Sequence, residues 1–440
     1  MRPPALDDAR DPTPRRPADA EGRPADAGRR PADAGRRAFL KRAAVGAAAF
    51  GAAGCEYESQ LFLLRSEPKR AGAPRPEWAE SRVRAWRPLG ATRFAMSDIS
   101  FGCANLANPE VVRAAIDRGV TYFDTSPDYS REGSERALGD GIRGTPRERL
   151  FIASKLCTAD GHLPADTPVA GVMAAVEGSL RRLGTDYLDL AHIHACNDLE
   201  RLLAPTFHEA VARLRGQGKL RFMGVSSHTP RLEQVMRAAV DSGRFDVIMV
   251  AYNFDEWPAL DGIFRDAHAN GVGVVAMKTL KGARHTALRD FTPSERESFA
   301  QAAFAWVLSN PHVSGLVVSI DDQRQLDEYL AASGAPVTPG DVALLRRYDR
   351  LVANDWCRPG CGECLEACPA GVPIDDVLRW ATYYEHYRHE RVAIEAYATV
   401  AAERRASACA ACPAPCEPAC PRGISIRAKL RRTHALLMLA

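Results

Sequence analysis

The stretch that decides the fold is Phe123-Asp124-Thr125-Ser126-Pro127-Asp128-Tyr129. It ends an apolar run over residues 119–123 and leads into a helical pattern over residues 132–142. An aspartate at a strand end, with a tyrosine five residues later in the next loop, occupies the position where barrel enzymes carry catalytic groups. The stretch therefore predicts a strand–loop–helix unit with chemistry at the carboxyl end of the strand.

Two later strand-like runs also end in titratable side chains. Residues 150–154 lead to Lys155, and residues 187–193 lead to His194. Each of these polar residues alone is most simply a hydrogen-bonded group at a strand end. Asp124, Tyr129, Lys155 and His194, each near a strand end, are therefore candidate functional residues, and their order in the chain is part of a resemblance to a known family.

Eight apolar runs, most of them followed by a helical pattern, lie between residues 88 and 333. They cover residues 99–102, 120–123, 150–155, 188–194, 221–225, 247–252, 272–277 and 314–320. This alternation predicts an α/β fold, a (β/α)8 TIM barrel. A doubly wound sheet is the alternative, but no glycine-rich turn follows the first run, and polar residues follow many different strands.

Eight of the twelve cysteines fall in two groups near the C-terminus, and each group ends in Cys-Pro followed by a glycine two residues later. Structural zinc and disulfides are alternatives, although zinc does not require the Cys-Pro ending. Three other cysteines, Cys103, Cys157 and Cys196, lie in or beside strands and are expected to be small buried residues. The two groups are Cys357, Cys361, Cys364 and Cys368, and Cys409, Cys412, Cys416 and Cys420.

The four candidate functional residues, in this order along the chain, and their surroundings resemble the aldo-keto reductases. Residues 134–139, 183–190, 224–227 and 274–280 resemble local sequences of that family, and the resemblance spans about residues 88–333. It implies reduction of a small aldehyde or ketone, or oxidation of the alcohol, with NADP or NAD. Tyr129 would be the proton donor, with its pKa lowered by Lys155, and Asp124 would hold Lys155. His194 would orient the carbonyl.

The same resemblance implies a dinucleotide lying across the strand ends. Ser226 and Ser227 would contact the carboxamide, and Tyr252 would stack on the nicotinamide. The diphosphate and 2′-phosphate candidates are Lys278, Thr279, Leu280 and Arg324. Asp321 and Asp322 stand where a 2′-phosphate would need cations, which puts the NADP preference in doubt.

The cysteine groups resemble bacterial ferredoxin segments that bind two [4Fe–4S] clusters, with one extra residue in one gap of each group. In such segments the fourth cysteine ligates the other cluster. The resemblance implies one cluster on Cys357, Cys361, Cys364 and Cys420. The second would be held by Cys409, Cys412, Cys416 and Cys368.

The N-terminal region resembles an export signal. Residues 1–35 are a low-complexity tail expected to be disordered. Arg36-Arg37 with Phe39-Leu40-Lys41 resembles a twin-arginine signal, and residues 52–55 resemble a lipoprotein box that would anchor Cys55 to a membrane. The remaining segments are a tether (56–86), the barrel (87–350) and a ferredoxin-like iron–sulfur domain (351–440).

These patterns together predict an exported, periplasmic or membrane-tethered oxidoreductase, with a cytoplasmic location as the alternative. The formal net charge of +3 gives no reason to expect nucleic acid. The expected partners are a small carbonyl or alcohol substrate and a redox partner protein. An alternative function is iron–sulfur electron transfer or scaffolding, with a barrel site that is little used.

Overall fold

The computed structural model describes residues 75–228, 230–254, 258–280, 298–355, 357–358, 361–386 and 390–438. The predicted tail, the twin-arginine signal, Cys55 and most of the tether lie outside these residues. None of the helices that the model describes is long and apolar enough to cross a membrane.

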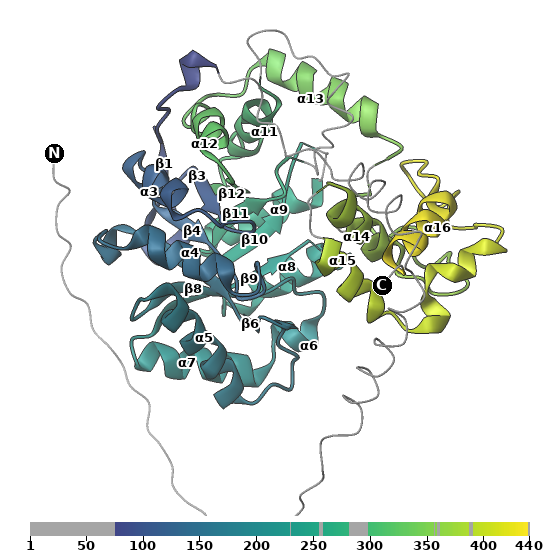
Figure 1. Ribbon diagram of the computed structural model, residues 1–440, viewed down its shortest axis with the longest axis horizontal. Coiled ribbons are helices and arrows are strands. Elements are labelled where there is room, and N and C mark those ends of the chain that lie inside the picture. Colours follow the sequence, from purple (N-terminus) through teal and green to yellow (C-terminus); the bar gives the residue numbers. More distant parts are fainter. Residues whose placement is uncertain are drawn as a thin grey trace, which may run out of the picture. The chain divides into compact units, whose positions relative to one another are not determined.

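Eight parallel strands close into a barrel, as the alternating pattern predicts (Figure 1). Each strand pairs with the next along the chain, and the last pairs with the first. The observed strands differ from the predicted runs by one or two residues at their ends. They are β3 (Ile99–Gly102), β4 (Tyr122–Asp124), β5 (Phe151–Lys155), β8 (Leu188–Ile193), β9 (Leu220–Ser227), β10 (Val247–Ala251), β11 (Gly273–Met277) and β12 (Gly315–Ser319).

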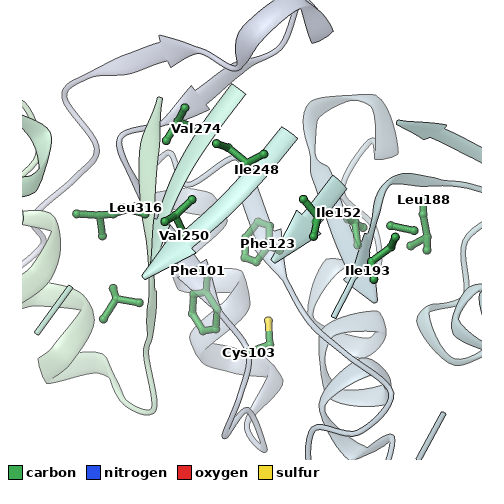
Figure 2. Packing of buried hydrophobic residues seen from close by; sticks show 14 of the residues in the cluster. Phe101, Cys103, Phe123, Ile152, Leu188, Ile193, Ile248, Val250, Val274 and Leu316 are labelled. Atoms are coloured by element: carbon green, nitrogen blue, oxygen red, sulfur yellow. The ribbon is translucent and has the colours of Figure 1, made fainter. Parts of the chain in front are cut away.

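Side chains alternate along each strand between the barrel interior and the layer under the helices. Tyr122, Phe151 and Leu190 belong to the interior cluster. The residues that follow them on the strands, such as Phe123 and Ile152, belong to the outer cluster. Figure 2 labels several members of this cluster. This register turns Asp124, Lys155 and His194 toward the interior at the carboxyl ends of their strands.

Helices surround the barrel, and their ends follow local sequence signals. Asn108 caps the first of them by accepting a hydrogen bond from the Glu110 backbone amide at 3.0 Å. Gly184 ends another in the left-handed conformation that glycine adopts easily. The helices are α3 (Pro109–Asp117), α4 (Gly133–Ile142), α5 (Val169–Leu183), α6 (Leu199–Leu202), α7 (Pro205–Gly216), α8 (Leu232–Ser242), α9 (Pro258–Ala269), α11 (Phe299–Leu308) and α12 (Gln323–Leu330).

A hairpin of β1 (Trp86–Pro88) and β2 (Ala95–Ser97) precedes the barrel. Leu89 and Met96 from this hairpin belong to the interior cluster, where they fill one end of the barrel. Upstream of it, Val83 is buried in the outer core and its amide donates to the Arg118 carbonyl at 2.9 Å. The predicted boundary at residue 86 is therefore wrong, because at least the last residues of the tether pack on the barrel.

The chain after the barrel forms a second core. Helix α13 (Pro339–Val352) packs on α11 through Leu344, Leu345 and Tyr348, so the barrel extends slightly past the predicted boundary at 350. The predicted helical stretch after the first cysteine group is two helices, α14 (Ile374–His386) and α15 (Glu390–Ala398). They pack with α16 (Ile426–Leu437) around Val377, Tyr397 and Leu430.

Replacing Gly224 by alanine should destabilise the barrel. A Cβ there would lie 2.5 Å from Nδ1 of His192, which is fully buried on the neighbouring strand β8. Overpacking of this kind costs about 1–3 kcal/mol, and urea denaturation would measure it. Gly216→Ala is the control, because a Cβ at Gly216 meets no atom within 4 Å. Equal stability of the two variants would contradict the assigned contact.

Candidate active site and cysteine centres

The centre of the site is a buried ion pair between Lys155 and Asp124. The Lys155 ammonium lies 2.5 Å from Oδ2 of Asp124 and donates to the Thr125 carbonyl at 3.0 Å. The two side chains are 1% and 4% exposed. Burial raises the pKa of Asp124, and the positive charge of Lys155 offsets part of that rise. Neither charge is stable here without the other.

Tyr129 and His194 lie beside this pair, so the four predicted residues are brought together. The Lys155 ammonium is 5.8 Å from the centre of the Tyr129 ring, and the His194 ring meets that ring edge-on at 5.9 Å. The predicted lowering of the Tyr129 pKa is wrong for this structure. Burial and the charges of Asp124 and Asp128 raise the pKa of Tyr129.

Asp128 joins the site although the sequence reasoning gave it no role. Its Oδ2 is 3.2 Å from Nδ1 of His194 and 3.7 Å from Nε2 of His162. Burial alone would raise the pKa of Asp128, but the charge and hydrogen bond of His194 hold it below its ordinary value. Asp128 therefore orients the His194 ring. Among the described residues, this trio is the one three-donor group whose atoms all lie within 4.8 Å of one another.

The dinucleotide candidates differ in their surroundings. The Ser226 hydroxyl accepts a hydrogen bond from the Ala195 amide at 3.0 Å, which fixes the loop carrying His194. Ser227 is fully buried next to it, and Leu280 packs on the outer core. The Thr279 hydroxyl is buried and has no hydrogen-bond partner in the described part of the chain. An unpaired buried hydroxyl at a strand end suits a polar ligand such as a diphosphate.

Tyr252 does not lie where the resemblance places it. It belongs to the outer cluster, as Val250 does, and its ring contacts Phe264 and Trp306. Its hydroxyl accepts a hydrogen bond from Asn310 at 3.2 Å. The prediction that Tyr252 stacks on nicotinamide is therefore wrong, because strand alternation turns this side chain away from the barrel mouth.

The residues after β12 do not form a favourable binding site for a 2′-phosphate. Asp322 caps α12 by accepting from the Gln325 amide at 2.9 Å, so a carboxylate already occupies that helix N-terminus. Arg324 is 52% exposed and lies 3.4 Å from Asp322. It lines a surface pocket with Trp78 and Asp327, outside the group formed by Lys155 and its neighbours. The predicted phosphate contact of Arg324 thus lacks support.

The cysteine-rich region contacts three loops at the carboxyl ends of the barrel strands. The Lys278 ammonium donates to the Tyr383 hydroxyl of α14 at 3.3 Å and lies 5.1 Å from the centre of its ring. Arg131 pairs with Glu395 of α15 at 3.2 Å. A Cβ placed on Gly362 would lie 3.6 Å from Pro230. The sequence gave no signal for this docking.

The cysteines gather in the crossed sets that the ferredoxin resemblance implies. One pocket is lined by the first set, and the charges of its members act on one another. In the second set, the charges of Cys368, Cys412 and Cys416 act on Cys409. All eight are free thiols in this structure. Burial and the neighbouring cysteines raise the pKa of Cys357 and Cys409, so holding these groups as thiolates would require a positively charged group between them.

The two cysteine groups are folded alike. Gly371 and Gly423 both have positive φ, and each donates its amide to the carbonyl of the preceding Cys-Pro cysteine at 3.1 Å. Helices α14 and α16 each begin three residues later. No three thiols of the described chain lie within 4.8 Å of one another. A zinc ion holds its sulfurs about 3.8 Å apart, so the wider spacing fits a larger metal cluster better.

Comparison with known proteins finds relatives of the barrel. Residues 104–295 match the model of the aldo/keto reductase family. The barrel is therefore similar to the domains of that family. An L-galactose dehydrogenase of Arabidopsis thaliana is 26% identical over 282 residues, covering 56% of this chain and 87% of that protein. A D-threo-aldose 1-dehydrogenase of a Pseudomonas species is 28% identical over 222 residues, covering 42% and 66%.

A solved structure agrees with the fold of this barrel. An aldo-keto reductase from Bacillus halodurans in its holo form has a TM-score of 0.50 and 22% identity, covering 61% of this chain and 96% of that one. The family match and the curated relatives support the prediction that the chain is an aldo-keto reductase-like NAD(P)-dependent oxidoreductase.

Five residues of the candidate site were missed from the sequence. Asp128 could have been found, because an acid beside the candidate Tyr129 suggests an electrostatic role. His162 lies on the hairpin of β6 (Cys157–Thr158) and β7 (Gly161–His162), which has no sequence signature. The others, His228, Arg379 and Tyr383, depend on tertiary docking.

Lys155→Met should destabilise the protein by about 3–5 kcal/mol, because it leaves the Asp124 carboxylate buried and unpaired. Asp124→Asn combined with Lys155→Met should recover much of that free energy, as measured by urea denaturation. Both variants should lack reductase turnover.

The exposed pair Lys219–Glu177, at 2.7 Å, provides the control. Lys219→Met should cost less than about 1 kcal/mol. If Lys155→Met were equally mild, the buried pair would not have the structural role assigned to it.

Proposed function

We propose that the barrel reduces an aldehyde or ketone, or oxidises the corresponding alcohol, with a nicotinamide dinucleotide, beside a domain that binds two [4Fe–4S] clusters. The observation that carries this proposal is the buried Asp124–Lys155 pair beside Tyr129 and His194 at the strand ends. A buried ion pair is a costly way to stabilise a fold, because hydrophobic residues could fill the same space, so this pair favours a catalytic role.

Each residue of the site has a distinct part in the proposed reaction. His194, oriented by Asp128, donates a hydrogen bond to the substrate oxygen. Tyr129 donates the proton, and the Lys155 ammonium stabilises the resulting phenolate once a substrate separates Tyr129 from water. Asp124 keeps Lys155 charged and in place. The bound nicotinamide would supply or accept the hydride.

The orphaned Thr279 hydroxyl and the Lys278 ammonium would hold the dinucleotide phosphates. Because Asp322 occupies the N-terminus of α12, NADH is the better candidate than NADPH. The names of the two curated relatives refer to sugars, so we propose a sugar or another small polyhydroxy carbonyl compound as the substrate class.

The two crossed cysteine sets would hold the clusters. Two backbone amides point at sulfur, Val372 at Cys368 and Ala414 at Cys412, each at 3.4 Å, and such bonds stabilise cluster thiolates. A cluster exchanges single electrons and a nicotinamide exchanges hydride, so the clusters would exchange electrons with a partner protein. Export through the twin-arginine signal, with a lipid anchor at Cys55, fits a protein that folds around clusters before transport.

Tyr129→Phe should lower turnover of small aldehydes at least about a hundredfold, because the proton donor is lost. Dinucleotide affinity should be unchanged, as measured by fluorescence quenching with NADH and NADPH on anaerobically purified protein. Tyr187 directly precedes β8, at the end of the strand away from the site, so Tyr187→Phe is the control. If wild-type protein bound neither dinucleotide, the electron-transfer alternative would replace the reductase proposal.

Cys361→Ser should remove one cluster and leave the other. Iron content should fall from about eight to about four atoms per chain, measured together with the visible absorption and the electron paramagnetic resonance of the reduced protein. Cys196→Ser is the control, since Cys196 is buried in the barrel. An unchanged iron content in Cys361→Ser, or zinc in its place, would overturn the cluster assignment.

A further inference from the structure

Helix α14 of the cysteine-rich region brings two polar side chains, Arg379 and Tyr383, to the barrel mouth. They are four residues apart on one helix and therefore share a face. Tyr383 accepts the hydrogen bond from Lys278, which follows β11. The charge of Tyr383 acts on Tyr129, and the charge of Arg379 acts on His228 and His162. The helix thus lies against the catalytic face.

The group contains two basic side chains, Lys278 and Arg379. No carboxylate in the described part of the chain lies within ion-pair distance of Lys278. Arg379 bonds Asp376 through Nη2, and the charge of Asp375 also acts on it. Together the two basic side chains hold the pKa of Tyr383 below its ordinary value, although burial opposes this. Because both acids face Arg379 from its own helix, its hydrogen-bonding capacity toward the barrel comes from Nε.

Two buried polar atoms of this group lack hydrogen-bond partners in the described structure. They are Nε of Arg379 and Nδ1 of His228. An unpaired buried donor is costly, commonly about 1–3 kcal/mol, and such atoms are usually satisfied by a ligand or water. Burial, Lys278 and Arg379 keep the pKa of His228 well below its ordinary value, so the ring is neutral and able to donate from one nitrogen.

We propose that Arg379 and His228 form a subsite for an anionic group of the substrate, a carboxylate or phosphate, with Tyr383 and its partner Lys278 at the edge of the subsite. The subsite rests on the proposed reductase function and narrows its substrate class to a carbonyl compound that carries a negative charge. It makes the cysteine-rich domain part of the substrate site.

The test compares matched substrates in the full-length holoprotein. Succinic semialdehyde and butanal differ by a carboxylate, and D-glyceraldehyde 3-phosphate and D-glyceraldehyde differ by a phosphate. Wild type should prefer the anionic member of one pair in kcat/KM, and Arg379→Met should reduce that preference about tenfold to a hundredfold. The effect should fall on KM. The substrate pair that shows this loss of preference identifies the anion as a carboxylate or a phosphate.

Two controls separate this role from general damage. Arg391 pairs with Glu395 on the exposed face of α15, and Arg391→Met should leave the preference intact. Tyr383→Phe should weaken the preference several-fold, whereas Tyr384→Phe, whose ring packs in the core of the cysteine-rich domain, should not. A preference that survives in Arg379→Met overturns the proposal. So does weaker NADH binding in that variant, because it would assign Arg379 to the dinucleotide phosphates.

A binding measurement keeps the subsite testable if none of the aldehydes is reduced. Calorimetric titration with succinate and with inorganic phosphate should show binding to wild type that is weakened about tenfold in Arg379→Met. Loss of turnover with this binding retained would reject the reductase proposal alone. Absence of binding by both anions in wild type would reject the subsite.

Discussion

The barrel mouth depends on one buried ion pair, Lys155 with Asp124. Removing two charges from water is costly, so the pair is stable only because each partner compensates the other and Thr125 accepts a further hydrogen bond. The pair fixes the ends of β4 and β5 relative to each other. Tyr129, on the loop that leaves β4, is placed by the same constraint. The positions of the four catalytic candidates therefore depend on how neighbouring strands pair.

Much of this arrangement could be predicted because it is local in sequence. A polar residue at the end of an apolar run must lie at the carboxyl edge of a parallel barrel, and alternation then decides its direction. The same rule explains the error at Tyr252. Val247 and Met249 face inward, whereas Val250 and Tyr252 belong to the outer cluster under the helices. Resemblance to a family placed the residue correctly along the chain but on the wrong face.

The remaining parts of the site depend on contacts between distant segments. Nothing in residues 374–386 indicates that one face of this helix meets the barrel, because an amphipathic helix in a cysteine-rich region is adequately explained by its own core. The direction of the Tyr129 pKa shift also could not be predicted from the sequence. That pKa is raised by burial and by the charges of Asp124 and Asp128, and both depend on how the folded chain surrounds the ring.

The crossed cysteine sets have a consequence for assembly. Each half of the cysteine-rich domain supplies three thiols to one set and one to the other, so neither half completes a set alone. Helix α14 connects the halves and also carries Arg379 and Tyr383. Cofactor insertion would therefore order the helix that finishes the barrel mouth, and a chain without its clusters would present an incomplete substrate site. The barrel would then become catalytically competent only after its metal centres had been assembled.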